Sequence, residues 1–396
     1  MKISDIKVIL VNDGTRSTYG SGWLPNYVFV KVYTDAGIEG VGEAFRTGKA
    51  RTTEAAVGEY ARWLVGRDPT EILRNWYAYV HGSRYPLGTA TQAALSAVEQ
   101  AMWDIAGKSC GLPVYKMLGG PFRDRVRVYA SNTLTQLSAN TGSDEPLMDG
   151  VGAVVEQGFS AVKFIPQPDD FEGRGPRQIL DESIDRVRTV REAVGEGVDI
   201  CLDYHGMDVS PSRAIEFARA VEPLNPLFLE EPVPTANVEG LREVKDKTAV
   251  AIAAGERCTS RSLLRQLLAR QALHIIQPEP ACNGGILETL KWAAVAEMYE
   301  IQIAPHHVGS PVSLLACCHL DACCPNFLIQ ECNADPRSAF FQELFGELPQ
   351  LEDGYLTLSD KPGLGIELDE EAAARYPYKP FDRRVVASPD GGIGII

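Results

Sequence analysis

Short apolar runs alternate with longer amphipathic stretches from about residue 125 onward. The runs are rich in β-branched residues, as buried strands are; they read RVRVYAS, SAVKFI, DICLDY, LFLEE, AIAAGE, HIIQPE, IQIAPH and FLIQE. Segments with helical spacing lie between them, such as 211–224, 260–272 and 285–300. Eight strands alternating with helices predict an α/β fold of the TIM-barrel type. A doubly wound sheet is the alternative, although no G-x-G-x-x-G turn follows the first strand.

The first 120 or so residues follow a different pattern. The segment YVFVKVYTDAGIEGVGEAF predicts a β-hairpin turned at Asp35-Ala36-Gly37, and helical stretches follow up to ALSAVEQAMWDIAGK. We therefore expect an α+β lobe over residues 1–124 and the barrel over residues 125–350. The tail, residues 351–396, is too short for a core of its own and must pack on another part of the chain.

Composition and charge narrow the range of partners. The chain of 396 residues is 45% hydrophobic and 23% charged, which is typical of a globular protein, and its formal net charge is −15. No block of Lys and Arg offers a surface for nucleic acid or anionic membranes. The N-terminus alternates like a strand and lacks the features of a signal peptide, and no apolar run reaches membrane-spanning length. These observations favour a cytoplasmic protein with a small-molecule partner.

Nine cysteines also fit a reducing compartment, because most of them stand apart rather than at disulfide-framework spacings. Two pairs, Cys317-Cys318 and Cys323-Cys324, raise the question of a metal site. The surrounding sequence, SPVSLLACCHLDACC, is apolar with helical spacing, and free cysteine packs as a small hydrophobic residue. We therefore expect these cysteines to form part of a helix wall.

Ionisable residues end seven successive predicted strands. Because barrel enzymes carry their chemistry at the carboxyl ends of the strands, these residues are the candidate site: Lys163, Asp203 with His205, Glu230, Glu256, Glu279, His306 and Glu331. An acid or base beside a packed apolar strand costs desolvation energy unless it is paired or bound to a metal. The pattern therefore indicates a functional site at the barrel mouth.

Three of these acids end consecutive strands. Asp203, Glu230 and Glu256 follow one another at intervals of 27 and 26 residues, so their carboxylates can converge. Three carboxylates without a thiolate suit a hard cation, Mg²⁺ before Mn²⁺. The alternative is that the acids pair with Lys or Arg at the barrel rim, as Arg257 could do with Glu256.

Two histidines can then act as an acid/base pair. Strand side chains alternate, so we expect His205 to face the same way as Asp203, and His306 to face the mouth while His307 is structural. Glu279 can hydrogen-bond the distal ring nitrogen of His306 and fix its tautomer, or else form a rim salt bridge. Lys163 can neutralise a substrate carboxylate, and Glu331 can hydrogen-bond an enolate oxygen if protonated, or else be a rim acid.

Together these segments resemble the enolase superfamily, in its mandelate racemase subgroup. ALSAVEQAMWDIAGKSCGLPVYKMLGG followed by RDRVRVYAS is similar to the junction between capping domain and barrel, and LDYHG, PLFLEEPV, AAGER, IIQPEPACNGGI, IAPHHVGSP and LIQE follow in family order. The Asp-x-His pair of LDYHG and the tail KPGLGIELDE look most like the branch of D-galactonate dehydratases.

The resemblance implies a modified (β/α)₇β barrel with an N-terminal α+β capping domain completed by the C-terminal tail. It also implies one Mg²⁺ per active site on Asp203, Glu230 and Glu256, and a homo-oligomer. The expected reaction is dehydration of a sugar acid of the galactonate kind: His306, supported by Glu279, removes the C2 proton and His205 protonates the departing 3-hydroxyl. Mg²⁺, Lys163 and Glu331 would stabilise the enediolate, and the product would be a 2-keto-3-deoxy sugar acid.

One departure leaves alternatives open: the family usually has aspartate where this chain has Glu279. Ile165 stands where a second base would be needed, which argues against lysine-based racemisation. An epimerase or lactone cycloisomerase using the same enediolate, or a sugar-acid binding protein on an inactive scaffold, are the alternative functions. For the distal hydroxyls of a substrate we expect contacts from the capping loop, through Arg16, Tyr19 and Trp23.

Overall fold

The structure is a computed structural model, and the statements below concern the residues whose placement it describes. These are residues 1–14, 25–46, 48–131, 145–168, 174–206, 210–333, 338–380, 386–387 and 393–394.

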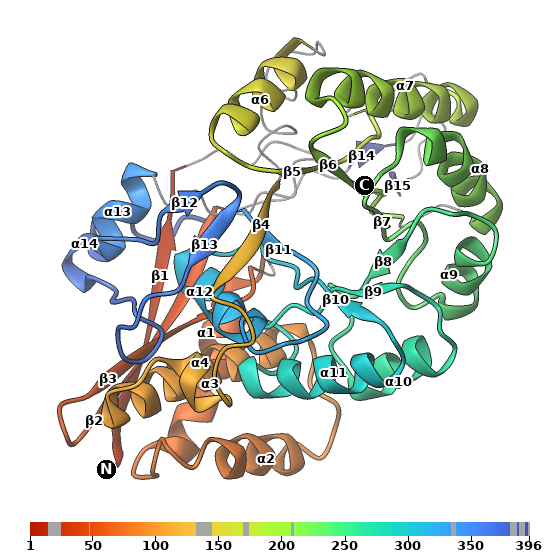
Figure 1. The fold of residues 1–396 in the computed structure, drawn as a ribbon. Coiled ribbons are helices and arrows are strands. Elements are labelled where there is room, and N and C mark those ends of the chain that lie inside the picture. Colours follow the sequence, from red (N-terminus) through yellow and green to blue (C-terminus); the bar gives the residue numbers. More distant parts are fainter. Residues whose placement is uncertain are drawn as a thin grey trace.

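The N-terminal lobe, which we call the cap, contains an antiparallel three-stranded sheet (Figure 1). Its strands are β1 (Ile3–Asn12), β2 (Asn26–Thr34) and β3 (Glu39–Ala44). The β2–β3 pairing runs from Val28 opposite Ala44 to Tyr33 opposite Glu39, which confirms the predicted hairpin.

Glycines allow a long helix to lie directly on this sheet. A Cβ atom at Gly40 or Gly42 would lie 2.2 or 2.0 Å from a backbone oxygen of α3 (Thr89–Cys110), so only glycine fits at these positions. The other helices of the cap are α1 (Ala50–Leu64), α2 (Ile72–Gly82) and α4 (Val114–Met117).

Eight parallel strands form the closed barrel. They are β4 (Arg125–Ser131), β5 (Ala161–Phe164), β6 (Asp199–Asp203), β7 (Phe228–Glu230), β8 (Ile252–Ala254), β9 (Ile275–Ile276), β10 (Gln302–Ile303) and β11 (Gln330–Cys332). From β4 to β10 each strand pairs with the next, and β11 pairs with β4 through Glu331 opposite Tyr129. A parallel bridge between Ile303 of β10 and Phe327, just before β11, closes the ring. This closure excludes the doubly wound alternative. The strands are shorter than the predicted runs, and Glu256, Glu279 and His306 follow the ends of β8, β9 and β10.

Helices surround the strands and alternate with them (Figure 1). Within the described ranges they are α6 (Glu145–Glu156), α7 (Pro176–Val194), α8 (Pro211–Val221), α9 (Val238–Lys245), α10 (Arg261–Ala269), α11 (Ile286–Met298) and α12 (Pro311–Asp321), with the short 3₁₀ turn η1 (Glu222–Leu224) after α8. In the described part of the chain an α-helix thus lies between each strand and the next, which confirms the modified (β/α)₇β barrel.

The barrel interior changes from apolar to polar toward its mouth. One buried apolar layer comprises Tyr129, Ala161, Cys201, Phe228, Ala253, Ile275, Ala304 and Ile329. Because strand side chains alternate, the residue two positions further on faces the interior one level higher. We call the eight residues that lie two positions beyond the members of the apolar layer the polar level. They are Ser131, Lys163, Asp203, Glu230, Gly255, Gln277, His306 and Glu331. The candidate site is thus built on an apolar floor.

The segment that follows β11 contacts both lobes. It contains α13 (Ala339–Phe345), β12 (Leu351–Glu352), β13 (Tyr355–Thr357), α14 (Glu370–Ala374), β14 (Val386–Ala387) and β15 (Ile393–Gly394). β13 adds to the barrel sheet, antiparallel to β4. Further on, Pro377 bridges to Val11 and the Asn26 side chain donates to the carbonyl of Lys379 at 2.9 Å, so the segment returns to the cap sheet. The domain boundaries themselves stay a prediction.

The paired cysteines lie in and just after α12. Cys317, Cys318 and Cys324 are buried, Cys323 is partly buried, and all nine cysteines are free thiols. Across the described residues, the one group of His, Cys, Asp or Glu side chains close enough to hold a metal lies at the barrel mouth and contains no cysteine. The helix-wall interpretation therefore fits these residues. No helix of the described ranges is both long and apolar enough to cross a membrane.

A buried histidine joins the lobes and gives a pH prediction. His319 accepts a hydrogen bond from the backbone N–H of Tyr115 at 3.3 Å, and its Nε2 lies 3.2 Å from the carbonyl of Leu364, so it is held neutral. Burial lowers its pKa from 6.5 to about 4. The unfolded chain therefore binds the proton first, and this contribution to stability is present above pH 6.5 and lost as the pH falls toward 4.

Replacing His319 by Gln removes that titration. We compare the free energy of unfolding of the wild type with that of His319→Gln. The difference should shrink by up to about 3 kcal/mol as the pH falls from 7 to 4. Urea unfolding at several pH values measures it. A difference that stays constant over this range would show that His319 does not titrate in this way.

Candidate active site

Lys163 lies at the centre of the polar level. Its Nζ is 2.8 Å from Glu230 Oε2, 3.0 Å from Glu331 Oε1 and 3.2 Å from Asp203 Oδ2, and the side chain is 2% exposed. Burial alone would lower the pKa of Lys163, but the Glu230 and Glu331 carboxylates outweigh it and hold this pKa well above its usual range. The Lys163 ammonium on β5 thus forms ion pairs with carboxylates from β6, β7 and β11.

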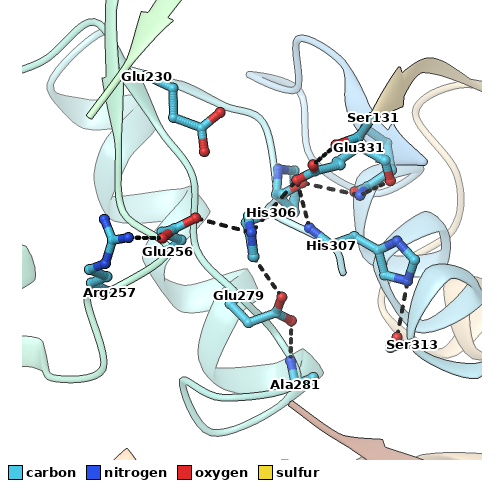
Figure 2. A network of polar contacts seen from close by, with 12 residues as sticks. Ser131, Glu230, Glu256, Arg257, Glu279, Ala281, His306, His307, Ser313 and Glu331 are labelled. Carbon is cyan, nitrogen blue, oxygen red and sulfur yellow. Dashed lines mark hydrogen bonds and ion pairs between the residues drawn. The ribbon is translucent and has the colours of Figure 1, made fainter. Parts of the chain in front are cut away.

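His306 is held between two further carboxylates (Figure 2). Its Nδ1 is 2.9 Å from Glu279 Oε2 and its Nε2 is 3.0 Å from Glu256 Oε2. Burial disfavours the imidazolium, yet Glu256 and Glu331 hold the pKa of His306 well above its usual range. The other oxygen of Glu279, Oε1, accepts from the N–H of Ala281 at 2.8 Å, which helps to hold this carboxylate beside the ring.

Glu331 is an ionised acceptor in this arrangement. It accepts from the Ser131 hydroxyl and, at 3.0 Å, from the backbone N–H of His307. Burial opposes its ionisation, but Lys163 and His306 lower its pKa. The protonated Glu331 considered from the sequence is therefore not favoured in the free site.

His307 points away from the mouth. Its Nε2 lies 3.1 Å from both the Ser310 carbonyl and the Ser313 hydroxyl, at the start of α12. Burial lowers its pKa to about 4, so the ring is neutral. These contacts fit the structural role expected for His307.

His205 reaches the site for a different reason from the one predicted. β6 ends at Asp203, so strand alternation does not extend to His205, whose φ of 45° lies in the left-handed region. Tyr204 packs on Phe217 of α8, with ring centroids 4.6 Å apart. The turn brings His205 Nε2 to 3.4 Å from Asp203 Oδ2 and leaves the side chain 32% exposed. His205 is thus the more accessible of the two candidate histidines.

Glu256 takes part in a rim pair and in the site at once. Its Oε1 is 3.0 Å from Arg257 Nη2, while its Oε2 faces His306. Arg257 also pairs with Glu231, which is fully buried. The rim salt bridge considered as an alternative therefore exists, but it occupies one oxygen of Glu256.

The carboxylates fit a hard divalent cation. Ligand atoms of Asp203, His205 and Glu256 lie within 4.8 Å of one another. Glu230 adds a buried Oε1 that has no partner among the described residues, and its carboxylate points toward Glu256 (Figure 2). Burial and the nearby Asp203 raise the pKa of Glu230 to about 8, which indicates an excess of negative charge. A divalent cation would relieve this excess, so the donor set suits such an ion.

The structure adds two residues to the candidate site that was predicted from the sequence. Ser131 and Glu231 were not predicted, although Ser131 ends its strand as the other candidates do. Arg16, Tyr19 and Trp23 lie outside the described residues, so their substrate contacts stay a prediction.

Glu43 of the cap anchors the loop that follows His306. Its carboxylate accepts from Ser310 N at 3.0 Å, Ser310 Oγ at 2.6 Å and Ser313 N at 3.2 Å, at the N-terminus of α12. The ring of Phe45, two residues on, packs 5.9 Å from the His306 ring. No sequence motif singled out Glu43, because this contact joins residues 267 positions apart.

Glu43→Gln tests this anchor. The new amide would place its N–H donors against the N–H groups at the start of α12. We therefore expect the free energy of unfolding to fall by about 1–3 kcal/mol and kcat to fall roughly tenfold. Glu39→Gln, in the same strand but 41% exposed, is the control and should change stability far less. Equal effects of the two changes would argue against the anchor.

Two regions of the chain match known families. Residues 6–119 match the N-terminal domain of mandelate racemase / muconate lactonizing enzyme, and residues 147–372 match the enolase C-terminal domain-like family. The chain is 36% identical over 367 residues to a D-galactonate dehydratase of Variovorax paradoxus, covering 91% of this chain and 93% of that protein. It is 37% identical over 356 residues to a D-galactonate dehydratase of Ralstonia nicotianae, covering 87% and 90%.

A solved structure agrees with these matches. An enolase from Agrobacterium radiobacter, bound to Na and L-malate, aligns with a TM-score of 0.87 at 31% identity and covers 99% of both chains. Fold and sequence thus agree. The chain belongs to the enolase superfamily of enzymes, in the group of mandelate racemase and muconate lactonizing enzyme.

Proposed function

We propose that this enzyme is a Mg²⁺-dependent dehydratase of a galactonate-like sugar acid. Two relatives named D-galactonate dehydratase, similar over most of their length, support the substrate class. The observation that carries the reaction type is the placement of two histidines beside one carboxylate: Glu256 lies 3.0 Å from His306 Nε2 and within 4.8 Å of a His205 ring nitrogen. Elimination of water needs one group to take a proton and another to give one.

Asp203, Glu230 and Glu256 would hold the cation, with His205 close enough to Asp203 and Glu256 to compete as a ligand. Bound there, Mg²⁺ supplies stabilisation of the negative charge that develops on the substrate carboxylate. Engagement of Glu256 by a cation would also free His306 from its hydrogen bond, and a neutral His306 can act as a base.

In the proposed reaction His306 Nε2 removes the C2 proton, while Glu279 accepts from Nδ1 and stabilises the positive ring. The Lys163 ammonium neutralises the substrate carboxylate. His205 gives its proton to the 3-hydroxyl, which leaves as water as the C2–C3 double bond forms. The resulting enol then takes a proton at C3 and becomes the 2-keto-3-deoxy acid, so that substrate equals product plus water.

Glu331 has a supporting part in this proposal. Its ionised carboxylate fixes Lys163 at 3.0 Å and is itself held by Ser131 and by the His307 N–H. Binding of an enediolate oxygen by Glu331 would require a proton gained in the substrate complex.

The first test is a screen of purified protein with Mg²⁺ against aldonic and aldaric acids, with detection of 2-keto acids. We expect activity on D-galactonate or a close stereoisomer, its loss with EDTA and its return with Mg²⁺. Epimerisation or lactone formation without a 2-keto acid would favour the isomerase alternative. No reaction and no exchange of the C2 proton with any acid would favour a binding protein.

A further inference from the structure

Gln277 belongs to the polar level, yet its side chain is unsatisfied. It is 0% exposed, and neither Oε1 nor Nε2 has a hydrogen-bond partner among the described residues. A buried amide without partners destabilises a fold, and an apolar side chain of the same size would avoid that cost. An amide at this position therefore needs a partner beyond the described residues, and a bound ligand can supply one.

Backbone contacts place Gln277 beside the reacting groups. Its N–H donates to the Ala254 carbonyl at 3.0 Å, and the carbonyl of the next residue, Pro278, accepts from the N–H of His306 at 3.1 Å. Gln277 therefore lies between the strand that leads to Glu256 and the loop that carries His306. β9 ends at Ile276, but the bond from the N–H of Gln277 to Ala254 continues its pairing with β8. Since Ile275 packs in the interior layer and Ile276 in the outer core, alternation along this extended backbone directs the Gln277 side chain inward.

The backbone at the end of the neighbouring strand approaches Gln277 closely. Gly255 has a φ of 146°, and a Cβ atom there would lie 2.8 Å from the backbone nitrogen of Gln277. The polar level thus carries no side chain between Glu230 and Gln277.

We propose that the Gln277 amide binds the hydroxy-acid end of the substrate, with Nε2 donating to a carboxylate oxygen and Oε1 accepting from a hydroxyl. This inference rests on the proposed function, because a sugar acid presents an acceptor and a donor on adjacent carbons, as an amide requires. The neutral amide also adds no charge to the polar level, where carboxylates already outnumber cations.

Binding without turnover tests the inference. In a His306→Asn background with Mg²⁺, calorimetry measures the Kd for D-galactonate. Adding Gln277→Met, which keeps the size and removes the polar atoms, should weaken binding by about 10- to 100-fold. It should also raise the Tm of the ligand-free protein by about 2–4 °C, because the unpaired amide is gone. Gln277→Asn keeps an amide but withdraws it by one methylene, and should weaken binding without that rise.

Thr53→Val is the matched control. Thr53 lies in α1 of the cap, is fully buried and has an unpartnered Oγ1 in the described part of the chain, so its removal should raise the Tm and leave the Kd unchanged. An unchanged Kd in both Gln277 variants would overturn the inference.

Failure of the proposed function gives a different result. In that case the His306→Asn parent itself binds no sugar acid of the library. The Tm of Gln277→Met, compared with that of its parent, then decides on Gln277. An unchanged or lower Tm means that the amide is already satisfied and overturns the inference. A higher Tm supports an unpaired amide that binds another acid.

Discussion

Replacing His306 by Asn is expected to lower kcat by about 10²–10⁴-fold. His306 is the proposed base, and Asn at this position has no group that can accept a proton from carbon near neutral pH. Exchange of the C2 proton with D₂O should disappear together with turnover. Initial rates of 2-keto acid formation and NMR of recovered substrate measure the two effects.

His205→Asn is the comparison that separates the two histidines. If His205 acts only after C2 deprotonation, its replacement should abolish loss of water but leave exchange at C2 detectable. Retention of exchange in His306→Asn, or its loss only in His205→Asn, would reverse the proposed roles of base and acid.

Lys163→Met is expected to reduce both activity and stability. The change leaves Glu230, Glu331 and Asp203 without the ammonium that lies within 3.2 Å of all three. Removing one partner of a buried ion pair costs about 3–5 kcal/mol, so the Tm without Mg²⁺ should fall clearly and kcat/KM should fall by about 10²-fold or more. Because the uncompensated carboxylates attract a cation more strongly, Mg²⁺ should raise the Tm of Lys163→Met more than that of the wild type.

Lys108→Met provides the control for a partly buried lysine outside the site. Lys108 Nζ lies 2.9 Å from the fully buried Asp104 in the cap. Its replacement should lower the Tm and leave kcat/KM nearly unchanged. A Lys163→Met enzyme that keeps kcat/KM within about threefold would contradict the role proposed for Lys163.

The barrel and most of the candidate site could be predicted because both follow from local sequence. Each strand is a short apolar run, and barrel closure brings the carboxyl ends of these runs to one mouth. Lys163, Asp203 and Glu331 therefore meet without any motif for their contact. The same rule would have found Ser131 and Gln277. Gln277 was passed over because an uncharged side chain gives no signal until its missing partners are known.

Other features depend on contacts or angles that the sequence does not reveal. His205 was expected to face the mouth through strand alternation, but a left-handed turn directs it there after β6 has ended. Glu43 joins β3 of the cap to the start of α12, and such a contact depends on how the two lobes pack. The sequence predicted that the carboxylates of Asp203, Glu230 and Glu256 converge on a metal. In the structure the group of possible ligand atoms within 4.8 Å of one another contains His205 in place of Glu230.

The proposed dehydration is tested most directly by incubating the enzyme with D-galactonate and Mg²⁺ in D₂O and following the reaction by NMR. We expect water to be lost, with formation of the 2-keto-3-deoxy acid carrying one deuterium at C3, where the enol is protonated. Recovery of the C2 epimer with deuterium at C2 and the 3-hydroxyl in place would show that the enzyme deprotonates a sugar acid without eliminating water, and would contradict the dehydratase assignment.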